Sequence, residues 1–430
     1  MSTKKYNDSL FKFIKSSTTA YHTVNAVKER LLSDGYTELS ERDDWALTEG
    51  GKYFVTKNGS SLIAFRYHSE YKGFVIAASH ADFCSFRVKM SMESTSDVYT
   101  TVPVEKYGGM IIYSWFDRPL SVAGRVMVKC DGGVESRLVD VDRDILVIPS
   151  VAPHMNPKVN SGFAPDLAVD TIPLMAACGE RVSLAEIIAE AAGVSSSDIV
   201  AHDLFLYVRE SGKPLGANED MIISPRIDNL ASVFASLEAF VSTNENGMLP
   251  VLAVFDNEEV GSDTKQGAAS TFLRDTLEEL SESRKAYKKA LSTSFMLSVD
   301  NAHAIHPNHP ELADPNNAPR LNGGVVIKHN ANQKYTTDAV SMSVVQTIAE
   351  RCGVKTQHFY NRADVRGGST LGSIATTRVS LPTVDIGISQ LAMHSAVEVA
   401  GAYDIESIVS LISGAYSSDI DIKGRKIIIK

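Results

Sequence analysis

The chain has 430 residues, of which 44% are hydrophobic and 22% are charged, and its formal net charge is −10. This length exceeds one comfortable hydrophobic core and predicts two domains, or one domain with a large insertion. The acidic balance argues against a nucleic-acid partner, which needs a basic face, and no apolar run reaches the roughly 20 residues that cross a bilayer.

The N-terminus and the cysteines indicate a cytoplasmic protein. The basic opening residues are not followed by the apolar segment of a signal peptide. The four cysteines form no close pair of the zinc-binding or redox type, so we expect them to be reduced thiols. They are Cys84, Cys130, Cys178 and Cys352.

The first 92 residues predict a helix followed by strands. Ser17 and Thr18 can cap a helix whose apolar residues recur at helical spacing up to Leu32. Asn58-Gly59 between two apolar runs is typical of a tight β-hairpin. The apolar run Phe74–Ala78 then predicts a buried strand.

Residues 93–222 predict a different mix of secondary structure. Short β-like runs predominate, and one predicted helix, Leu184–Ala192, lies among them. This segment predicts a separate β-rich domain inserted into the rest of the chain. The predicted strands are Gly109–Tyr113, Arg125–Lys129, Ile145–Ile148 and Leu204–Val208.

From residue 223 onward, predicted helices and strands alternate, which implies an α/β fold with a mixed, mostly parallel sheet and helices on both faces. We expect the N-terminal strands to join this sheet, so that residues 1–92 and 223–430 form one discontinuous catalytic domain. The predicted helices are 228–242, 268–280, 337–351 and 405–415, and the predicted strands are 251–255, 295–299, 354–359 and 384–386.

Residue types that bind metal ions follow the predicted strands, where the active sites of such sheets lie. His80 and Asp82 follow the strand 74–78, and Asp256, Asn257, Glu258 and Glu259 follow the strand 251–255. Asp300, His303 and His306 follow the strand 295–299, and a loop after the strand 384–386 ends at His394.

Two histidines and three carboxylates suit a pair of zinc-like ions that share one carboxylate. We expect His80, Asp228 and Asp300 to bind one ion. Asp228, Glu259 and His394 would bind the other, with Asp228 bridging. Zinc is the first choice, but manganese or cobalt would also suit these ligands.

Two residues beside the predicted ligands have supporting roles. Glu258 would remain free of metal and act as the general base, taking a proton from water and returning it to the leaving amine. Asp82 would accept the other imidazole N–H of His80 and fix its tautomer.

Each of these residues alone also has an ordinary explanation. An acidic pair after a strand is usually a solvated loop, Asp228 could simply cap a helix, and His394 could be a core histidine. His303 and His306 share helical spacing, but three carboxylates already serve as ligands, and both are left as loop residues or as residues that support the ligands.

At these positions the sequence resembles the aspartyl aminopeptidases and their bacterial relatives. The matching segments occur in the family's order across nearly the whole chain. They are Ser79–Asp82, Trp115–Arg118 with Ala123–Arg125, Arg226–Leu230, Asp256–Ser262, Asp300–Asn308 and Gln390–Ser395.

The resemblance implies a two-metal peptidase domain with an inserted β-rich domain, assembled as a tetrahedral homododecamer that acts on peptides. At the matching positions it implies the same five ligands and the same base. It also implies that His154, in the segment Ile148–His154, enters the site of a neighbouring subunit, where it could stabilise an oxyanion.

The same resemblance implies a preference for N-terminal aspartate or glutamate. Lys328 matches a lysine that faces the acidic side chain, although a lysine after an apolar strand could equally reach to water. Gly368 and Ser369 lie in the stretch Gly367–Gly372, which resembles a loop that lines the substrate pocket.

Two departures from the family pattern leave the preferred residue open. Ala81, Phe83 and Cys84 replace the residues that usually surround the aspartate after the first histidine, and the residues that follow His154 lack the usual basic pattern. A deacylase or carboxypeptidase on the same core, and a catalytically silent self-assembling shell protein, are the alternative functions.

Overall fold

The computed structural model describes residues 3–96, 98–177, 182–243, 247–423 and 426–430. It divides into two compact units, the first made of residues 1–82, 212–393 and 398–430, and the second of residues 83–211 and 394–397. Cys178 lies outside the described residues, and none of Cys84, Cys130 and Cys352 forms a disulfide with another described residue. Among the described residues, no helix combines the length and apolar character needed to cross a membrane.

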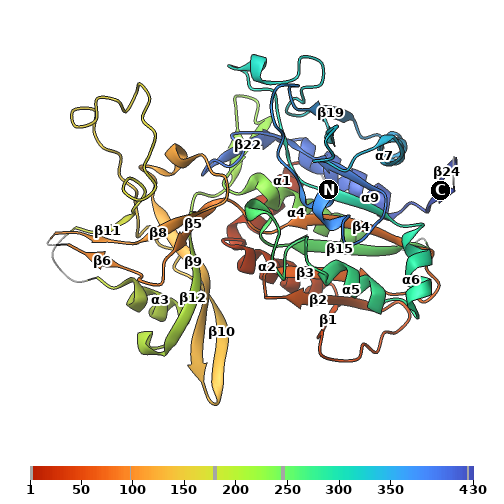
Figure 1. The fold of residues 1–430 in the computed structure, drawn as a ribbon, viewed down its shortest axis with the longest axis horizontal. Helices are drawn as coiled ribbons and strands as arrows, with labels where there is room; N and C mark the ends of the chain where they lie inside the picture. The colour runs from red at the N-terminus through yellow and green to blue at the C-terminus, as the bar shows by residue number, and fades with distance from the viewer. Residues whose placement is uncertain (1–2, 97, 178–181, 244–246, 424–425) are drawn as a thin grey trace. The chain divides into compact units, whose positions relative to one another are not determined.

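The first unit is built around a nine-stranded sheet with the order β1-β2-β3-β15-β4-β16-β20-β18-β19 (Figure 1). Most neighbouring strands are parallel, and the antiparallel pairs are β2–β3, β3–β15 and β18–β20. The strands are β1 (Thr37–Leu39), β2 (Lys52–Lys57), β3 (Ser61–Arg66), β4 (Phe74–His80), β15 (Leu249–Phe255), β16 (Phe295–Val299), β18 (Val325–His329), β19 (Thr356–Tyr360) and β20 (Thr383–Gly387).

Helices cover both faces of this sheet, as the alternation in the sequence predicts. Ile76 and Ala78 of β4 belong to a buried apolar cluster with α5, α6 and α8 on one face, while α4 and α9 contact β4 and each other. The helices are α1 (Thr3–Ser16), α2 (Ala20–Ser33), α4 (Ile227–Ser242), α5 (Phe272–Glu279), α6 (Arg284–Leu291), α7 (Ala339–Cys352), α8 (Leu371–Ala375) and α9 (Asp404–Tyr416).

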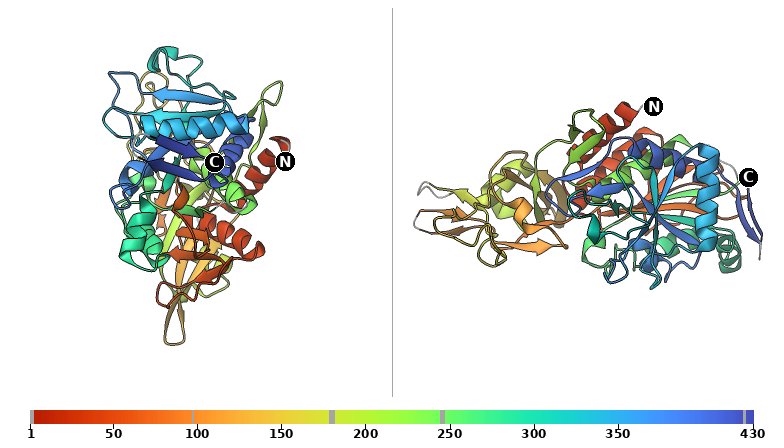
Figure 2. Two further views of the ribbon diagram at one scale, coloured as in Figure 1. Left: turned by 90° about the vertical axis from the view of Figure 1, so that its right-hand side faces the viewer. Right: turned by 90° about the horizontal axis from the view of Figure 1, so that it is seen from above.

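Two smaller sheets complete the first unit. A five-stranded sheet has the order β13-β14-β22-β21-β17, and β23 pairs with β24 in a hairpin close to the C-terminus (Figure 2). The strands are β13 (Lys213–Leu215), β14 (Met221–Ser224), β17 (Ala302–His303), β21 (Ser389–Leu391), β22 (Glu398–Gly401), β23 (Ile420–Lys423) and β24 (Lys426–Ile429).

The second unit is β-rich and has its own apolar core around Phe86, Trp115 and Val126. It contains a five-stranded antiparallel sheet, β10-β9-β12-β5-β8, and a three-stranded sheet, β11-β7-β6. Its elements are β5 (Ser85–Val88), β6 (Ser94–Thr95), β7 (Thr100–Thr101), β8 (Val104–Tyr107), β9 (Leu120–Cys130), β10 (Gly133–Asp140), β11 (Leu174–Ala176), α3 (Leu184–Ala192) and β12 (Ile199–Val208).

The units divide close to residues 82 and 211, whereas the sequence placed the boundaries after residues 92 and 222. Strand pairing explains the difference. β5 joins the sheet of the second unit, whereas β13 pairs with β14 and β14 pairs with β22 in the first unit. Within the second unit, the expected strand Gly109–Tyr113 is wrong, because Ile112–Trp115 forms a 3-10 turn. The expected strand Ile145–Ile148 makes only isolated bridges.

Several local signals are confirmed. Asn58 and Gly59 both have positive φ and join β2 to β3 in an antiparallel hairpin. The helix predicted up to Leu32 is α2, but its N-cap is Thr19, whose hydroxyl accepts the N–H of His22. α1 was not predicted.

Gly124 in β9 offers a test of how the second unit is packed. A Cβ atom at this position would lie 2.0 Å from the carbonyl oxygen of Asp203 in the neighbouring strand β12, and the φ of Gly124 is +155°. Backbone cannot retreat from such a clash without breaking the ladder, so Gly124→Ala is expected to lower the free energy of unfolding by about 3 kcal/mol or more. Urea denaturation followed by circular dichroism measures this change.

Gly133→Ala is the matched control, because Gly133 opens the adjacent strand β10 and a Cβ there meets no atom within 4 Å. Equal stability of the two variants would contradict the close approach of β9 and β12 at Gly124.

Candidate metal centre

The carboxyl ends of parallel strands bring the candidate residues together in the first unit. β4 is flanked by β15 and β16 in parallel register, and Phe255 pairs with His80 at the strand ends. His80 ends β4, Glu258 follows β15, and Asp300 follows β16. The adjacent ends of these strands therefore present their side chains at one edge of the sheet.

His80, Asp228 and Asp300 form a buried cluster whose candidate ligand atoms all lie within 4.8 Å of one another. The Nε2 atom of His80 lies 3.7 Å from Oδ1 of Asp228 and 3.7 Å from Oδ1 of Asp300. One imidazole and two carboxylates that converge in a buried space are a donor set that fits a divalent ion such as zinc.

Asp228 approaches this cluster from the start of α4, in a backbone conformation that is not helical. Its φ and ψ are −82° and 110°, and the peptide bond to Asn229 is cis. The preceding Arg226 adopts positive φ, and its side chain makes no capping hydrogen bond to the helix. Asp228 was predicted to open the helix, and the structure directs its carboxylate toward His80.

Asp82 contacts both His80 and the acidic loop, which follows β15 and contains Glu258 and Glu259. Its Oδ1 and Oδ2 atoms accept the backbone N–H groups of Glu258 and Glu259, each at 3.1 Å. The Nδ1 atom of His80 lies 3.0 Å from the carbonyl oxygen of Asp82 and 3.4 Å from its Oδ1. The backbone carbonyl of Asp82 is thus nearer to Nδ1 than the carboxylate that the sequence analysis expected to accept this N–H. The carboxylate also holds the Glu258–Glu259 backbone, which the sequence did not reveal.

The electrostatics of the cluster separate Glu258 from Asp300. Burial raises the pKa of Glu258 well above its ordinary value, and Asp300, Glu259 and Asp82 raise it further against the opposing effect of His80. Burial would also raise the pKa of Asp300, but Lys328 and His80 outweigh burial and hold that pKa below its ordinary value. Asp300 is thus favoured as an anion, and Glu258 is favoured as a group that takes up a proton.

The pKa values of His80 in the cluster and of Asp256 beside it are also shifted. Burial lowers the pKa of His80, but the carboxylates of Asp300 and Asp82 outweigh it and the pKa rises well above the ordinary value. Burial also raises the pKa of Asp256 to about 7, and the negative charge of Asp82 contributes to this rise.

Lys328 of β18 is buried and points to the cluster. Its Nζ atom lies 3.2 Å from Oδ2 of Asp300, donates to the carbonyl of Asn301 at 3.2 Å, and lies over the ring of Tyr335. Burial would lower the pKa of Lys328, but the charge of Asp300 keeps it above its ordinary value. The expectation that this lysine could reach to water is wrong, because its side chain is only 2% exposed.

A cavity of about 380 Å³ is lined by residues from β17, β19 and β21 and from the loops beside them. Gly368 of the predicted substrate loop lines it, together with Gln390, His303 and His306. Neither histidine belongs to the cluster, and the Nδ1 atom of His306 accepts the N–H of Asn308 at 3.2 Å. Ser369 is exposed in the same loop.

Two predicted residues, His394 and His154, belong to the second unit. His394 has positive φ, and its Nδ1 atom lies 3.1 Å from the carbonyl oxygen of Gly109. Such a bond orients an imidazole and leaves Nε2 for a ligand. His154 lies in an exposed loop between the bridge at Ile148 and β11.

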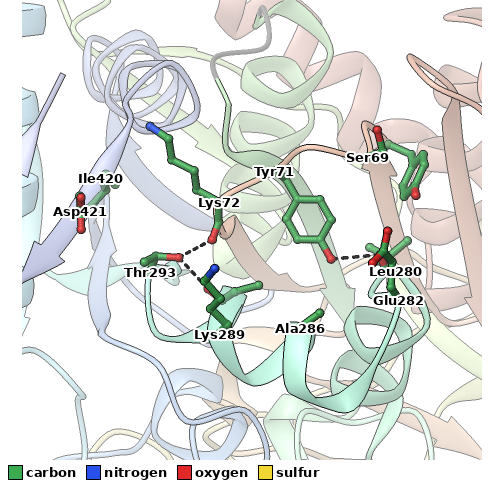
Figure 3. Close-up of a pocket in the computed structure, with 12 residues that line it drawn as sticks. Ser69, Tyr71, Lys72, Leu280, Glu282, Ala286, Lys289, Thr293, Ile420 and Asp421 are labelled. Carbon is green, nitrogen blue, oxygen red and sulfur yellow. Dashed lines mark hydrogen bonds between the residues drawn. The ribbon is translucent and has the colours of Figure 1, made fainter.

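A second cavity, of about 470 Å³, is lined by Tyr71, Lys72 and Thr293 among others (Figure 3). Lys72, which lines it, precedes β4 and therefore lies at the opposite end of that strand from His80. The hydroxyl of Tyr71 donates to the carbonyl of Leu280, and the hydroxyl of Thr293 donates to the carbonyl of Lys72. This cavity contains no part of the candidate metal centre.

The sequence did not predict that Asn301, Gln390 and Glu398 form hydrogen bonds beside the cluster. Glu398 accepts the N–H of Asp228 at 2.9 Å, and Gln390 links Glu398 to Asn301. Asn301 and Gln390 lie within motifs that the sequence singled out, but Glu398 carried no local signal.

Known proteins are similar to nearly the whole chain. A family model described as aminopeptidase I zinc metalloprotease (M18) matches residues 13–416. A probable M18 family aminopeptidase 2 from Clostridium acetobutylicum is 44% identical over 409 residues, which cover 92% of this chain and 94% of the relative.

Solved structures are similar over nearly the whole chain. A cryo-EM structure of the Ape4 and Nbr1 complex contains a chain that is 36% identical with a TM-score of 0.93, and the match covers 96% of this chain and 86% of that one. A structure of the S. cerevisiae mApe1 dodecamer is 26% identical with a TM-score of 0.82, covering 95% and 97% of the two chains.

Replacing Asp82 tests its double role. Asn at this position has one acceptor oxygen and cannot accept both backbone N–H groups of Glu258 and Glu259. Asp82→Asn is therefore expected to lower kcat or zinc affinity by about 10- to 100-fold, as for other residues that support metal ligands. Peptidase assays and zinc titration measure the two effects. Unchanged values for both would exclude Asp82 from holding the acidic loop.

Proposed function

Because the chain belongs to the aminopeptidase I zinc metalloprotease family M18, we propose that it removes N-terminal residues from peptides with two divalent ions and with Glu258 as general base. The observation that carries the proposal is the buried convergence of His80, Asp228 and Asp300 beside Glu258. The alternatives of a deacylase, a carboxypeptidase or a silent shell protein lack comparable support from the comparisons.

His80, Asp228 and Asp300 would hold one ion, and Asp228, Glu259 and His394 would hold the second. Divalent ions there would supply Lewis-acid polarisation of the scissile carbonyl and would favour deprotonation of water. Zinc is the first candidate because the family is a zinc metalloprotease family.

Residues of the chain carry out the proton transfer and hold the reacting groups in position. Glu258 takes a proton from the attacking water and delivers it to the leaving amine, a role that its raised pKa favours. Asp82 keeps Glu258 in place through the backbone and keeps His80 in orientation. Hydrolysis thereby adds water across one peptide bond and releases a free amino acid and a shortened peptide.

Substrate recognition is proposed to involve Lys328, Gly368 and Ser369. Gly368 lines the 380 Å³ cavity, and the cation of Lys328 lies beside Asp300. A cation at this position would favour N-terminal aspartate or glutamate over neutral residues.

Assembly as a homododecamer is proposed because the similar mApe1 structure is a dodecamer. The second unit carries exposed apolar side chains, including Val134, Met155 and Val169, which suit contact with other subunits. His154 lies close to Met155 in the chain and would enter the site of a neighbouring subunit. The tetrahedral arrangement is proposed from the family resemblance, and the cytoplasmic location is proposed from the N-terminal residues and the cysteines.

Glu258→Gln tests the base. The amide keeps the size of the side chain but cannot accept a proton, so kcat is expected to fall by roughly 10²- to 10⁴-fold. Zinc content should stay at the wild-type level, because Glu258 is not a proposed ligand. Steady-state peptidase kinetics measure kcat, and metal analysis measures the zinc content. Retained activity would remove Glu258 from the role of base.

Lys328→Met tests acidic recognition, since Met fills similar space without the charge. The ratio of kcat/KM for N-terminal Asp over Leu reporters is expected to fall by about tenfold or more, the effect of roughly 1.4 kcal/mol. Zinc content is measured in parallel, because Lys328 also contacts Asp300. An unchanged ratio would refute a direct role in substrate choice.

A further inference from the structure

Glu398 lies on β22, behind the cluster, and its carboxylate is almost completely buried. Only 2% of this residue is exposed. Its position is fixed from both sides of the strand, because Glu398 pairs with Ser224 of β14 and β21 pairs with the following residues of β22. Burying a carboxylate is costly unless hydrogen bonds compensate, so its partners indicate what holds it there.

The first partner is the backbone of Asp228. Oε2 of Glu398 accepts the Asp228 N–H at 2.9 Å within the first residues of α4. Asp228 and Asn229 depart from helical φ and ψ, so this N–H lies before the regular part of the helix. Glu398 therefore holds, from a distant strand, the irregular backbone that directs Asp228 toward the cluster.

The second partner continues toward the other side of the cluster. The Nε2 atom of Gln390 donates to Oε1 of Glu398 at 3.3 Å, and the Nδ2 atom of Asn301 donates to Oε1 of Gln390 at 2.8 Å. Asn301 follows Asp300 directly, and its Nδ2 also donates to the carbonyl of Ile227 at 3.0 Å.

These bonds form a closed path that links the chain at Asp228 to the chain at Asp300 without using either carboxylate. Asn301 and Gln390 are as buried as Glu398, with 3% and 1% exposure. Lys328 joins the path as well, since it donates to the carbonyl of Asn301 while it contacts Asp300. Groups other than the two carboxylates thus fix the backbone at Asp228 and at Asp300.

We propose that Glu398 is a positioning residue that sets the separation of Asp228 and Asp300 through Gln390 and Asn301, and so sets the affinity for the metal ion. This inference rests on the proposed function, because it assumes that Asp228 and Asp300 are ligands. Glu398 itself touches neither metal nor substrate in this role.

Glu398→Ala in the full-length protein is the principal test, with Zn²⁺ affinity measured by competition with a chromophoric chelator. Loss of this hydrogen bond frees the Asp228 backbone, and the dissociation constant for Zn²⁺ is expected to rise by about 10- to 100-fold. With Co²⁺ in place of Zn²⁺, the visible absorption spectrum should change, because the carboxylates no longer meet the ion at the same separation.

Glu238→Ala is the matched control. Glu238 is a buried glutamate on the same helix, α4, where it pairs with Arg30 instead of supporting the cluster. General weakening of α4 would change the Zn²⁺ affinity of both variants alike, whereas positioning of Asp228 predicts a change for Glu398→Ala alone. Equal affinities in the two variants, changed or unchanged, would overturn the proposal.

Glu398→Gln keeps the test decisive if the alanine variant fails to fold. The amide oxygen can still accept the Asp228 N–H, but its NH₂ group then faces the NH₂ group of Gln390. Zn²⁺ affinity is expected to lie between those of the wild type and of Glu398→Ala, with KM unchanged once Zn²⁺ is saturating. Wild-type affinity in a folded Glu398→Gln variant that keeps the wild-type Co²⁺ spectrum would count against the proposal.

A His80→Ala variant separates this inference from the proposed function. If His80→Ala and the wild type bind Zn²⁺ equally, then the cluster is not the metal centre and the proposed function fails. If His80→Ala loses Zn²⁺ while Glu398→Ala does not, only the positioning role of Glu398 fails.

Discussion

The carboxylate of Asp82 is the contact on which the rest of the site depends. It accepts the backbone N–H groups of Glu258 and Glu259 and lies beside the imidazole of His80. One side chain therefore fixes the end of β4 relative to the loop that follows β15. Because the proposed base and a proposed ligand occupy adjacent positions in that loop, a small displacement there would disturb both functions together.

The fold prepares this contact through parallel pairing. β15, β4 and β16 end at the same edge of the sheet, so residues distant in sequence arrive together without long loops. α4 contributes Asp228 from the same edge, and Glu398 on β22 holds its first turn. Opposite charges then complete the cluster, since Lys328 balances Asp300 while Glu258 is left with a raised pKa.

Part of this arrangement was readable from residue patterns. Alternating helices and strands gave the mixed sheet, and the metal-binding residue types after strands pointed to its edge. The domain boundaries near residues 82 and 211 were not readable, because strand partners rather than composition assign β5 to one unit and β13 to the other. The strand expected at Gly109–Tyr113 was wrong, because Ile112–Trp115 forms a 3-10 turn although its residues are β-like.

The sequence by itself determined the kind of chemistry, because His80, Asp228, Glu258 and Asp300 are residue types with few other uses in combination. Only the tertiary structure decided how they are held. Glu398 is separated from Asp228 by 170 positions, and the burial of Lys328 against Asp300 depends on how β18 packs. Local patterns carry no information about such distant partners, because hydrogen bonds between strands and helices are set by the packing of the whole sheet.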